Sequence, residues 1–442
     1  MRIKSACIFS VLLTGFFTAL SAHAKEIQQE KELTVTIEQA VEYAVKGNIG
    51  LMKNTVSLNE AKRTKNFSWN AFSPSLSAGA SWSKEVPASE KSALSKSSDA
   101  GTITVQANAN LALTPSLYTN IKSASLAYER QLITYEQAVR SVELNVRTSF
   151  WALLNQQENI SLQEKKLEAG KKQYESNLAK FNRGALSKLD VLTAQVSYQE
   201  AQVNLEAAKT SRETAMATFK QILGLPQETK ITLLGSLEEI LSLKEISREN
   251  LSINSPDIIL LKKRIEQAKN SLTATRLTCY GPSLSASYSY SMSSPADDTG
   301  SLKDNGGGTL RIGATLPLDG LLPWSNGSQN IENQKDNLKT LELELEEQKT
   351  SLDVTINNYL SQIKQIQDLI ALRKSSIELA EQSYTMALDA YNHGTKDLLS
   401  LQNAQDSLFS TRVNLLTQAY TLETTVLNLE NIIGVPFGTL GK

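Results

Sequence analysis

Four short segments of the chain alternate strictly between apolar and small polar side chains. Residues 282–291 read PSLSASYSYS and residues 74–83 read PSLSAGASWS. Such alternation places every apolar side chain on one face of a β-strand and every polar one on the other. The pattern predicts four strands, at about 74–84, 101–113, 282–291 and 309–318.

The apolar faces of these strands have two interpretations. In a soluble sheet they would cover a core, whereas in a membrane barrel they would face lipid and the polar faces would line a wet lumen. We favour lipid, because the two strands of each half are too few for an independent sheet. Four strands also cannot close a membrane barrel, and unpaired edges are not tolerated in lipid, so several chains would have to pool their strands.

Long helices are predicted from a second periodicity. No proline occurs between about 118 and 181, and apolar residues there recur three or four positions apart, as in a coiled-coil seam. The seam positions are Leu132, Tyr135, Val139, Val142, Val146, Phe150 and Leu153, and in the second half Ile356, Tyr359, Ile363, Ile366 and Ile370. A helix of about sixty residues extends roughly 90 Å and needs neighbours along its whole length.

The two halves of the chain repeat one plan. Residues 181–205 align with 391–415 at a constant shift of 210, which matches Gly184 with Gly394. We expect these glycines to end the long helices as C′ caps, and return helices to begin near Ser187 and Thr395. A period near 200 residues is too long for a solenoid repeat. We therefore predict a duplicated half-molecule, 25–235 and 236–442, with the order helix, two strands, long helix and return helix in each.

The first 24 residues have the features of a secretory signal peptide: a basic start, an apolar run and the small-x-small sequence AHA. A buried N-terminal helix is the alternative. Removing Arg2 and Lys4 leaves 45 − 2 = 43 basic residues against 46 acidic ones, which gives no reason to expect nucleic acid as a partner. No later apolar run approaches the roughly 20 residues of a spanning helix, so a membrane crossing would have to use strands.

The sequence offers little chemistry. After residue 24 it keeps one cysteine and one histidine, Cys279 and His393, too few for a disulfide or a histidine-rich metal site. It contains no phosphate-binding loop and no histidine placed to serve a nucleophile. We expect no enzyme activity and no cofactor, but a passive duct with selectivity set by the charge and width of its pore.

The duplicated order, the PSLSA strand openings, the F/Y-N-x-G turns, and LGLP at 223–226 with IGVP at 433–436 resemble the TolC-type outer-membrane efflux proteins. The resemblance runs from about Leu33 to Phe437. It implies a mostly α-helical fold with a membrane β-barrel portion, in which a homotrimer pools its strands into twelve. It also implies a place in the outer membrane of a diderm bacterium, and a helical tunnel that reaches a periplasmic adaptor and an inner-membrane transporter.

The resemblance also implies a gate at the tunnel end. The family's inter-helix latch falls on Asp190 with Tyr391, and its basic partner on Lys396. Two positions that carry aspartate rings in the family are Ser400 and Asn403 here. Three copies of each would form a neutral constriction, where block by cations should be weaker.

Ordinary structural roles remain open for all these residues. Asp190 follows Ser187 by three positions and fits a capping box, and Tyr391 fits seam packing. Lys396 would otherwise be a solvated lysine, and Ser400 and Asn403 solvent-facing polar residues. Arg311 lies on the polar face of its strand and is predicted to point into the barrel lumen, the alternative being a surface arginine near a loop.

Two other functions compete with the duct. The first is a trimeric, barrel-anchored coiled-coil surface or adhesive protein, which would not need hairpins and gate-like turns in both halves. The second is a soluble periplasmic adaptor, which would carry one helical hairpin beside a soluble β-domain. Four serine-alternating strands argue against the adaptor.

Overall fold

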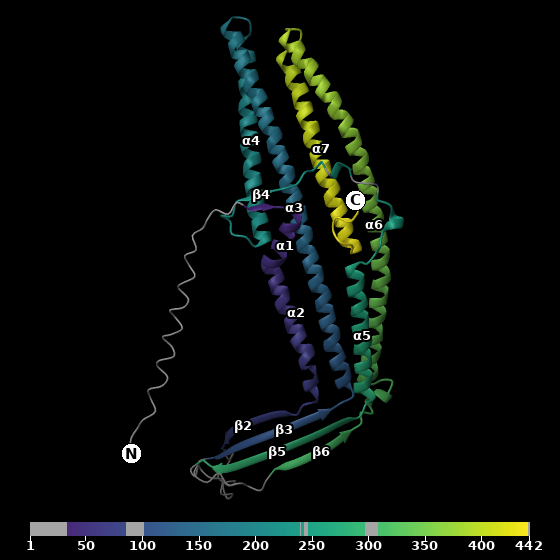
Figure 1. Cartoon of the computed structure of the whole chain (residues 1–442). Helices are drawn as coiled ribbons and strands as arrows, with labels where there is room; N and C mark the ends of the chain where they lie inside the picture. The colour runs from purple at the N-terminus through teal and green to yellow at the C-terminus, as the bar shows by residue number, and fades with distance from the viewer. Residues whose placement is uncertain (1–32, 85–100, 239, 243–245, 297–307, 441–442) are drawn as a thin grey trace, which may run out of the picture. The chain divides into compact units, whose positions relative to one another are not determined.

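The computed structural model describes residues 33–84, 101–238, 240–242, 246–296 and 308–440 (Figure 1). The expected signal peptide, at 1–24, lies outside the described residues, as does most of the two polar segments between the paired strands. The chain divides into two compact units. Unit 1 combines the chain up to Asn48 with Asn145–Ser242 and Leu372–Tyr420, and unit 2 combines Ile49–Leu144, Leu243–Ala371 and Thr421–Lys442.

Two pairs of long helices dominate the fold. Helices α3 (Ser116–Asn182) and α6 (Asn326–Asn392) have 67 residues each, and return helices α4 (Lys188–Leu223) and α7 (Leu398–Ile433) have 36 each. Helix α6 begins 210 positions after α3, and α7 begins 210 positions after α4, since 326 − 116 = 210 and 398 − 188 = 210. A helix of 67 residues is about 100 Å long. The duplicated, mostly helical fold class predicted from the sequence is confirmed.

The first helix of the predicted order is formed as two helices, α1 (Ile37–Gly47) and α2 (Ile49–Phe67). A capping box between Thr36 and Gln39 begins α1. The break falls at Asn48, whose backbone is extended and whose side-chain amide donates to the Ile222 carbonyl at 3.1 Å. The other helices of the described residues are α5 (Pro256–Tyr280) and four short 3₁₀ helices. These are η1 (Ser68–Phe72), η3 (Ile240–Ser242), η4 (Arg248–Asn250) and η5 (Asp319–Leu321).

A small parallel pair in unit 1 joins β1 (Leu33–Val35) to β4 (Ile231–Leu233). Sequence periodicity did not predict this pair, because three residues are too few to show alternation. The pair connects the start of the described chain to the segment after α4.

The four alternating segments form one antiparallel sheet in unit 2, in the order β2-β3-β5-β6. Its strands are β2 (Ser75–Ser83), β3 (Thr102–Leu113), β5 (Ser283–Pro295) and β6 (Thr309–Thr315). Strand β5 extends beyond the expected end at 291, because Met292 and its neighbours continue the ladder with β3. Strand β6 ends before the expected 318, since Pro317 has no N–H to donate.

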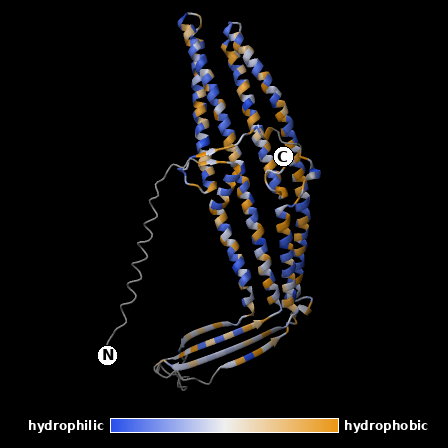
Figure 2. Ribbon diagram, viewed as in Figure 1, coloured by the Kyte–Doolittle hydropathy of each residue, from blue (hydrophilic) through white to orange (hydrophobic). Residues whose placement is uncertain are grey.

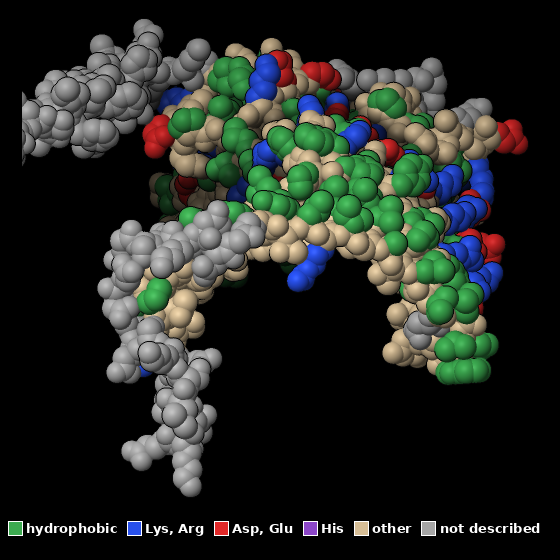
Figure 3. Space-filling view, turned by 90° about the horizontal axis from the view of Figure 1, so that it is seen from below, with side chains coloured by type: hydrophobic (Ala, Val, Ile, Leu, Met, Phe, Trp, Pro, Cys, Tyr) green, Lys and Arg blue, Asp and Glu red, His purple; other side chains and the backbone are tan. Residues whose placement is uncertain are grey.

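The register sorts the sheet's side chains by face. One row across the strands contains Leu76, Ala109, Tyr288 and Leu310, and the next row contains Ser77, Asn108, Ser289 and Thr309. Adjacent rows point to opposite faces, so one face is apolar and the other polar. Seen from below, hydrophobic side chains gather in a broad band, and side chains of other types border the hollow beside it (Figure 3). Within the described residues, no helix is long and apolar enough to span a membrane.

Hydrophobic and hydrophilic residues intermix along all the long helices (Figure 2). In unit 1 the first seam is buried at Val146, Phe150 and Leu153. In unit 2 the second seam is buried at Ile356, Ile363, Ile366 and Ile370. Leu132, by contrast, remains 37% exposed in the single chain. The predicted seam is therefore covered unevenly by this chain's own helices.

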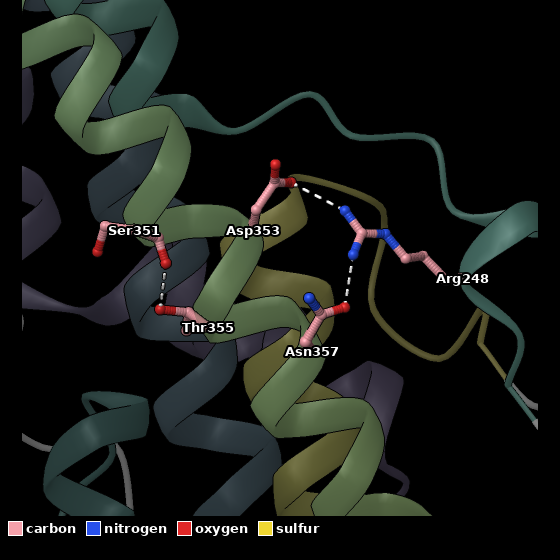
Figure 4. A network of polar contacts seen from close by, with 5 residues as sticks. All are labelled: Arg248, Ser351, Asp353, Thr355 and Asn357. Atoms are coloured by element: carbon pink, nitrogen blue, oxygen red, sulfur yellow. Dashed lines mark hydrogen bonds and ion pairs between the residues drawn. The ribbon is translucent and has the colours of Figure 1, made fainter.

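Two polar anchors in unit 2 attach irregular chain to the helices. The Arg248 guanidinium donates to Asn357 Oδ1 at 2.6 Å and to Asp353 Oδ1 at 3.1 Å, one turn apart on α6 (Figure 4). The fully buried Glu430 carboxylate accepts three backbone N–H groups, from Gly438, Thr439 and Leu440, each at 2.8 Å. These bonds fold the C-terminal segment back onto the end of α7.

Candidate functional site

The tips of the two helical hairpins lie in unit 1 and share one backbone motif. Gly184 N–H donates to the Phe181 carbonyl at 2.8 Å, and Ala185 N–H donates to the Lys180 carbonyl at 3.0 Å. The second tip repeats this pattern around Gly394, with bonds of 3.0 and 2.9 Å. Both glycines have positive φ, +73° and +75°, as a Schellman C-cap requires.

The two return helices begin with caps made of one serine and one aspartate, which occur in opposite order in the two helices. In α4 the Ser187 hydroxyl accepts from Asp190 N–H at 3.2 Å and donates to the Asp190 carboxylate at 2.6 Å. In α7 the acid comes first, and Asp397 Oδ1 accepts from Ser400 N–H at 2.9 Å. Hydrogen bonds from the Ser400 side chain and backbone lower the pKa of Asp397. Because Asp397 is the cap, α7 begins at Leu398 and not near Thr395 as expected.

A buried polar network connects the two hairpins. The Tyr391 hydroxyl on α6 donates to Asn177 Oδ1 on α3 at 2.7 Å, and Gln173 Nε2 donates to the same oxygen at 2.8 Å. Asn177 Nδ2 donates to the Asp190 backbone carbonyl on α4 at 3.5 Å. Asn177 is fully buried and Tyr391 nearly so. One amide therefore links three helices.

Apolar packing surrounds the tyrosine of this network. Tyr391 belongs to a buried cluster with Ala194, Leu398 and Leu401. Lys180 Nζ lies 4.9 Å from the centre of the Tyr391 ring, a cation–π arrangement. Burial raises the pKa of the Tyr391 hydroxyl, and the hydrogen bond from Tyr391 to Asn177 opposes this rise. The hydroxyl is therefore protonated at neutral pH and acts as a hydrogen-bond donor.

A cavity of about 680 Å³ opens beside the network, between the two turns. The charged side chains and the histidine that line it are Lys180, Arg183, Asp190, His393, Lys396 and Asp397. The Asp397 carboxylate caps α7, whereas the Asp190 carboxylate accepts a hydrogen bond from the hydroxyl of Ser187, the N-cap of α4. The lining thus carries three lysine and arginine side chains against two carboxylates.

The structure places the expected latch residues around this cavity. Asp190 and Tyr391 are connected through Asn177, because the single Tyr391 hydroxyl proton is donated to the amide. Lys396 is exposed on the cavity lining. Sequence analysis missed Asn177, since its only signal was a polar residue amid many others on a long helix.

The remaining expected site residues lie elsewhere. Ser400 is half-buried and bonded to Asp397 as part of the cap of α7, whereas Asn403 is exposed. Arg311 is exposed on β6, opposite Ser287 of β5, in the row that also contains Asn110. It therefore shares the polar face of the sheet.

Further polar contacts tie α7 to the first hairpin. Gln402 Nε2 donates to Ser197 Oγ on α4 at 2.8 Å. Lys166 Nζ on α3 lies 2.6 Å from Asp406 Oδ1. The Asp406 side chain is 62% exposed, so this ion pair contributes little stability on its own.

No metal chemistry is indicated at this site. Among the described residues, no group of three or more His, Cys, Asp or Glu side chains is arranged to hold a metal ion. His393 Nδ1 lies 2.9 Å from the Asp389 backbone carbonyl, within its own helix end. Cys279 Sγ contacts the Gly327 carbonyl at 3.6 Å.

Solved structures of channel proteins are similar in fold to this chain. The Campylobacter jejuni CmeC outer membrane channel matches with a TM-score of 0.72 at 19% identity, over 90% of this chain and 85% of that one. A structure of CusC matches with a TM-score of 0.70 at 16% identity, over 94% and 96% of the two chains.

Relatives in sequence are outer membrane proteins. The outer membrane protein TolC of Escherichia coli (strain K12) is 22% identical over 342 residues, 74% of this chain and 69% of the relative. The outer membrane efflux protein BepC of Brucella suis biovar 1 (strain 1330) is 22% identical over 423 residues, 93% and 86% of the two chains. The family described as "Outer membrane efflux protein" matches residues 44–225 and 248–435. The chain therefore belongs to the outer membrane efflux protein family, and its place is the outer membrane.

Proposed function

We propose that this protein is the outer-membrane exit duct of a tripartite efflux or type I secretion system. It conducts substrates passively from an inner-membrane transporter and a periplasmic adaptor to the cell exterior. The observation that carries the proposal is the register of the sheet, which gathers the apolar side chains on one face and serine, asparagine and Arg311 on the other. An enzymatic role finds no support in this arrangement.

The proposal requires an oligomer, which the resemblance to the family makes a homotrimer. Strands β2 and β6 form the two edges of the four-stranded sheet, and a sheet edge in lipid needs a partner strand. Three chains would pool twelve strands around one lumen, into which Arg311 would point. Apolar side chains left on the outside of the helices support an oligomer as well, among them Val203, Leu379 and Met386, at 68%, 65% and 73% exposed.

The periplasmic end would be closed by the hairpin tips. Asp190, Tyr391 and Lys396 form the latch of this proposal, and Gly184 and Gly394 make the turns that position it. Ser400 and Asn403 would face the narrowest part of the tunnel. Because neither is acidic, the constriction would be neutral and attract cations weakly.

Conductance across a planar lipid bilayer tests the duct. Purified, heat-sensitive oligomers from outer-membrane extracts should form channels, and Asp190→Ala combined with Tyr391→Phe should raise their conductance. An adhesive stalk with a barrel anchor, the alternative function, would give no channels. Recovery of the protein as soluble periplasmic monomers would refute both.

A further inference from the structure

We propose that Asn177 is the positioning residue that holds the two hairpin tips of one chain together, and that the closed state depends on it as much as on Tyr391. The inference rests on the proposed duct and names a part of its gate that the latch residues do not include. It comes from the buried amide network on α3, α4 and α6.

The hydrogen-bonding capacity of Asn177 is nearly filled. An amide oxygen has two acceptor sites, and here they receive Tyr391 at 2.7 Å and Gln173 at 2.8 Å. The amide nitrogen reaches the Asp190 carbonyl. Asn177 is 0% exposed, so water cannot replace these partners while the tip stays packed. Removing the amide would leave the Tyr391 hydroxyl buried without an acceptor, which is costlier than losing a surface contact.

The duplication shows that the fold does not need this bond. Shifted by 210, Asn177 corresponds to Ala387 and Tyr391 corresponds to Phe181. Neither counterpart has a side-chain group for a hydrogen bond, yet both hairpins form the same helices and the same turns. The bond therefore forms between position 177 of the first half and position 391 of the second, and has no equivalent between positions 387 and 181. The hairpin fold does not require it.

The bond also lies where opening would act. Tyr391 immediately precedes Asn392, the last residue of α6, and lines the cavity between the turns. Asp190 is in the first turn of α4. A movement that separates the end of α6 from the start of α4 must break the contacts of Asn177, because one amide holds α3, α4 and α6.

A double-mutant comparison tests this role. Asn177→Leu removes the amide at nearly constant volume, Tyr391→Phe removes the hydroxyl, and the double variant removes both. The control is Asn182→Leu, which makes the same change at an exposed site at the end of α3. Each is purified as an oligomer, and the ratio of open to closed channels is recorded in planar bilayers.

We expect Asn177→Leu and Tyr391→Phe each to raise that ratio about tenfold, the factor expected for one buried hydrogen bond. The double variant should not exceed Asn177→Leu appreciably, because the bond between Tyr391 and Asn177 is already absent from that single variant. A purely structural loss of packing would instead add to the effect of Tyr391→Phe. Asn182→Leu should behave as the unaltered protein.

The possible outcomes distinguish a failure of the role proposed for Asn177 from a failure of the proposed duct. Should Asn177→Leu match the unaltered channel while Tyr391→Phe opens it, the role of Asn177 is refuted and the duct stands; an additive double variant refutes it too. No channel from any variant refutes the duct itself. If Asn177→Leu does not assemble, Asn177→Ser, too short to reach Tyr391, takes its place and is judged by the same outcomes.

Discussion

Replacing Ile312 with arginine tests whether the apolar face of the sheet contacts lipid or water. Ile312 lies on β6 in the row of Ala286 and Leu111, and its side chain is 77% exposed in the single chain. If that face met water, the change would alter stability by no more than about 0.5 kcal/mol. If it meets lipid near the bilayer midplane, an arginine costs about 2–4 kcal/mol. The second value corresponds to a roughly 30- to 1000-fold fall in the ratio of folded to unfolded protein.

Ser289→Arg is the matched control for this prediction. Ser289 is exposed on the neighbouring strand, in the polar row with Asn108 and Thr309. The assay is the yield of heat-sensitive oligomer in outer-membrane extracts, by gel electrophoresis before and after boiling. We expect Ile312→Arg to lose most of its oligomer and Ser289→Arg to keep it. Equal yields, or a greater loss for Ser289→Arg, would refute the lipid-facing assignment.

Three further predictions concern the helix ends. Glu430→Ala leaves three part-buried N–H groups without their acceptor and should lower the free energy of unfolding by about 3 kcal/mol, measured by denaturant titration; an unchanged midpoint would contradict this. Gly434→Ala should lower the melting temperature more than Gly394→Ala, because an added Cβ would meet the Asn254 carbonyl at 434 and open space at 394. The pKa of Asp397 is lowered in the folded state, so its stabilisation of α7 is present above the ordinary value of 3.8 and is lost as the pH falls further. Asp397→Asn should flatten the acid limb of a thermal-melting pH series, and an unaltered acid limb would count against the cap.

The long-range plan of the fold was readable from the sequence because it rests on repetition. Apolar residues that recur every 2.0 positions indicate the strands, and those that recur about every 3.5 positions indicate the long helices. The shift of 210 between the two halves of the sequence reappears as pairs of helices of equal length. Strand ends were less certain. Pro317 was visible in the sequence, yet the alternation continued past it, and the ladder that extends β5 depends on β3, nearly 190 positions away.

The candidate site was less predictable, for a physical reason. A positive-φ glycine and a capping pair are local, so Gly184, Gly394 and the Ser187–Asp190 pair stand out in sequence. The role of Asn177 depends on its hydrogen bond with Tyr391, 214 positions away, and on its complete burial from water. No local pattern separates such an amide from the many polar residues on the outer faces of the same helices.

Alternate thiol labelling along β5 distinguishes the side chains of the sheet that contact lipid from those that contact water. Cys279, partly exposed, is first replaced by serine, and single cysteines are then placed at positions 284 to 289 of the assembled protein. We expect cysteines at 285, 287 and 289 to react with a membrane-impermeant reagent, whereas those at 284, 286 and 288 react only with a lipid-soluble one. Equal reaction of both sets with the aqueous reagent, or protection of the serine positions, would contradict this expectation.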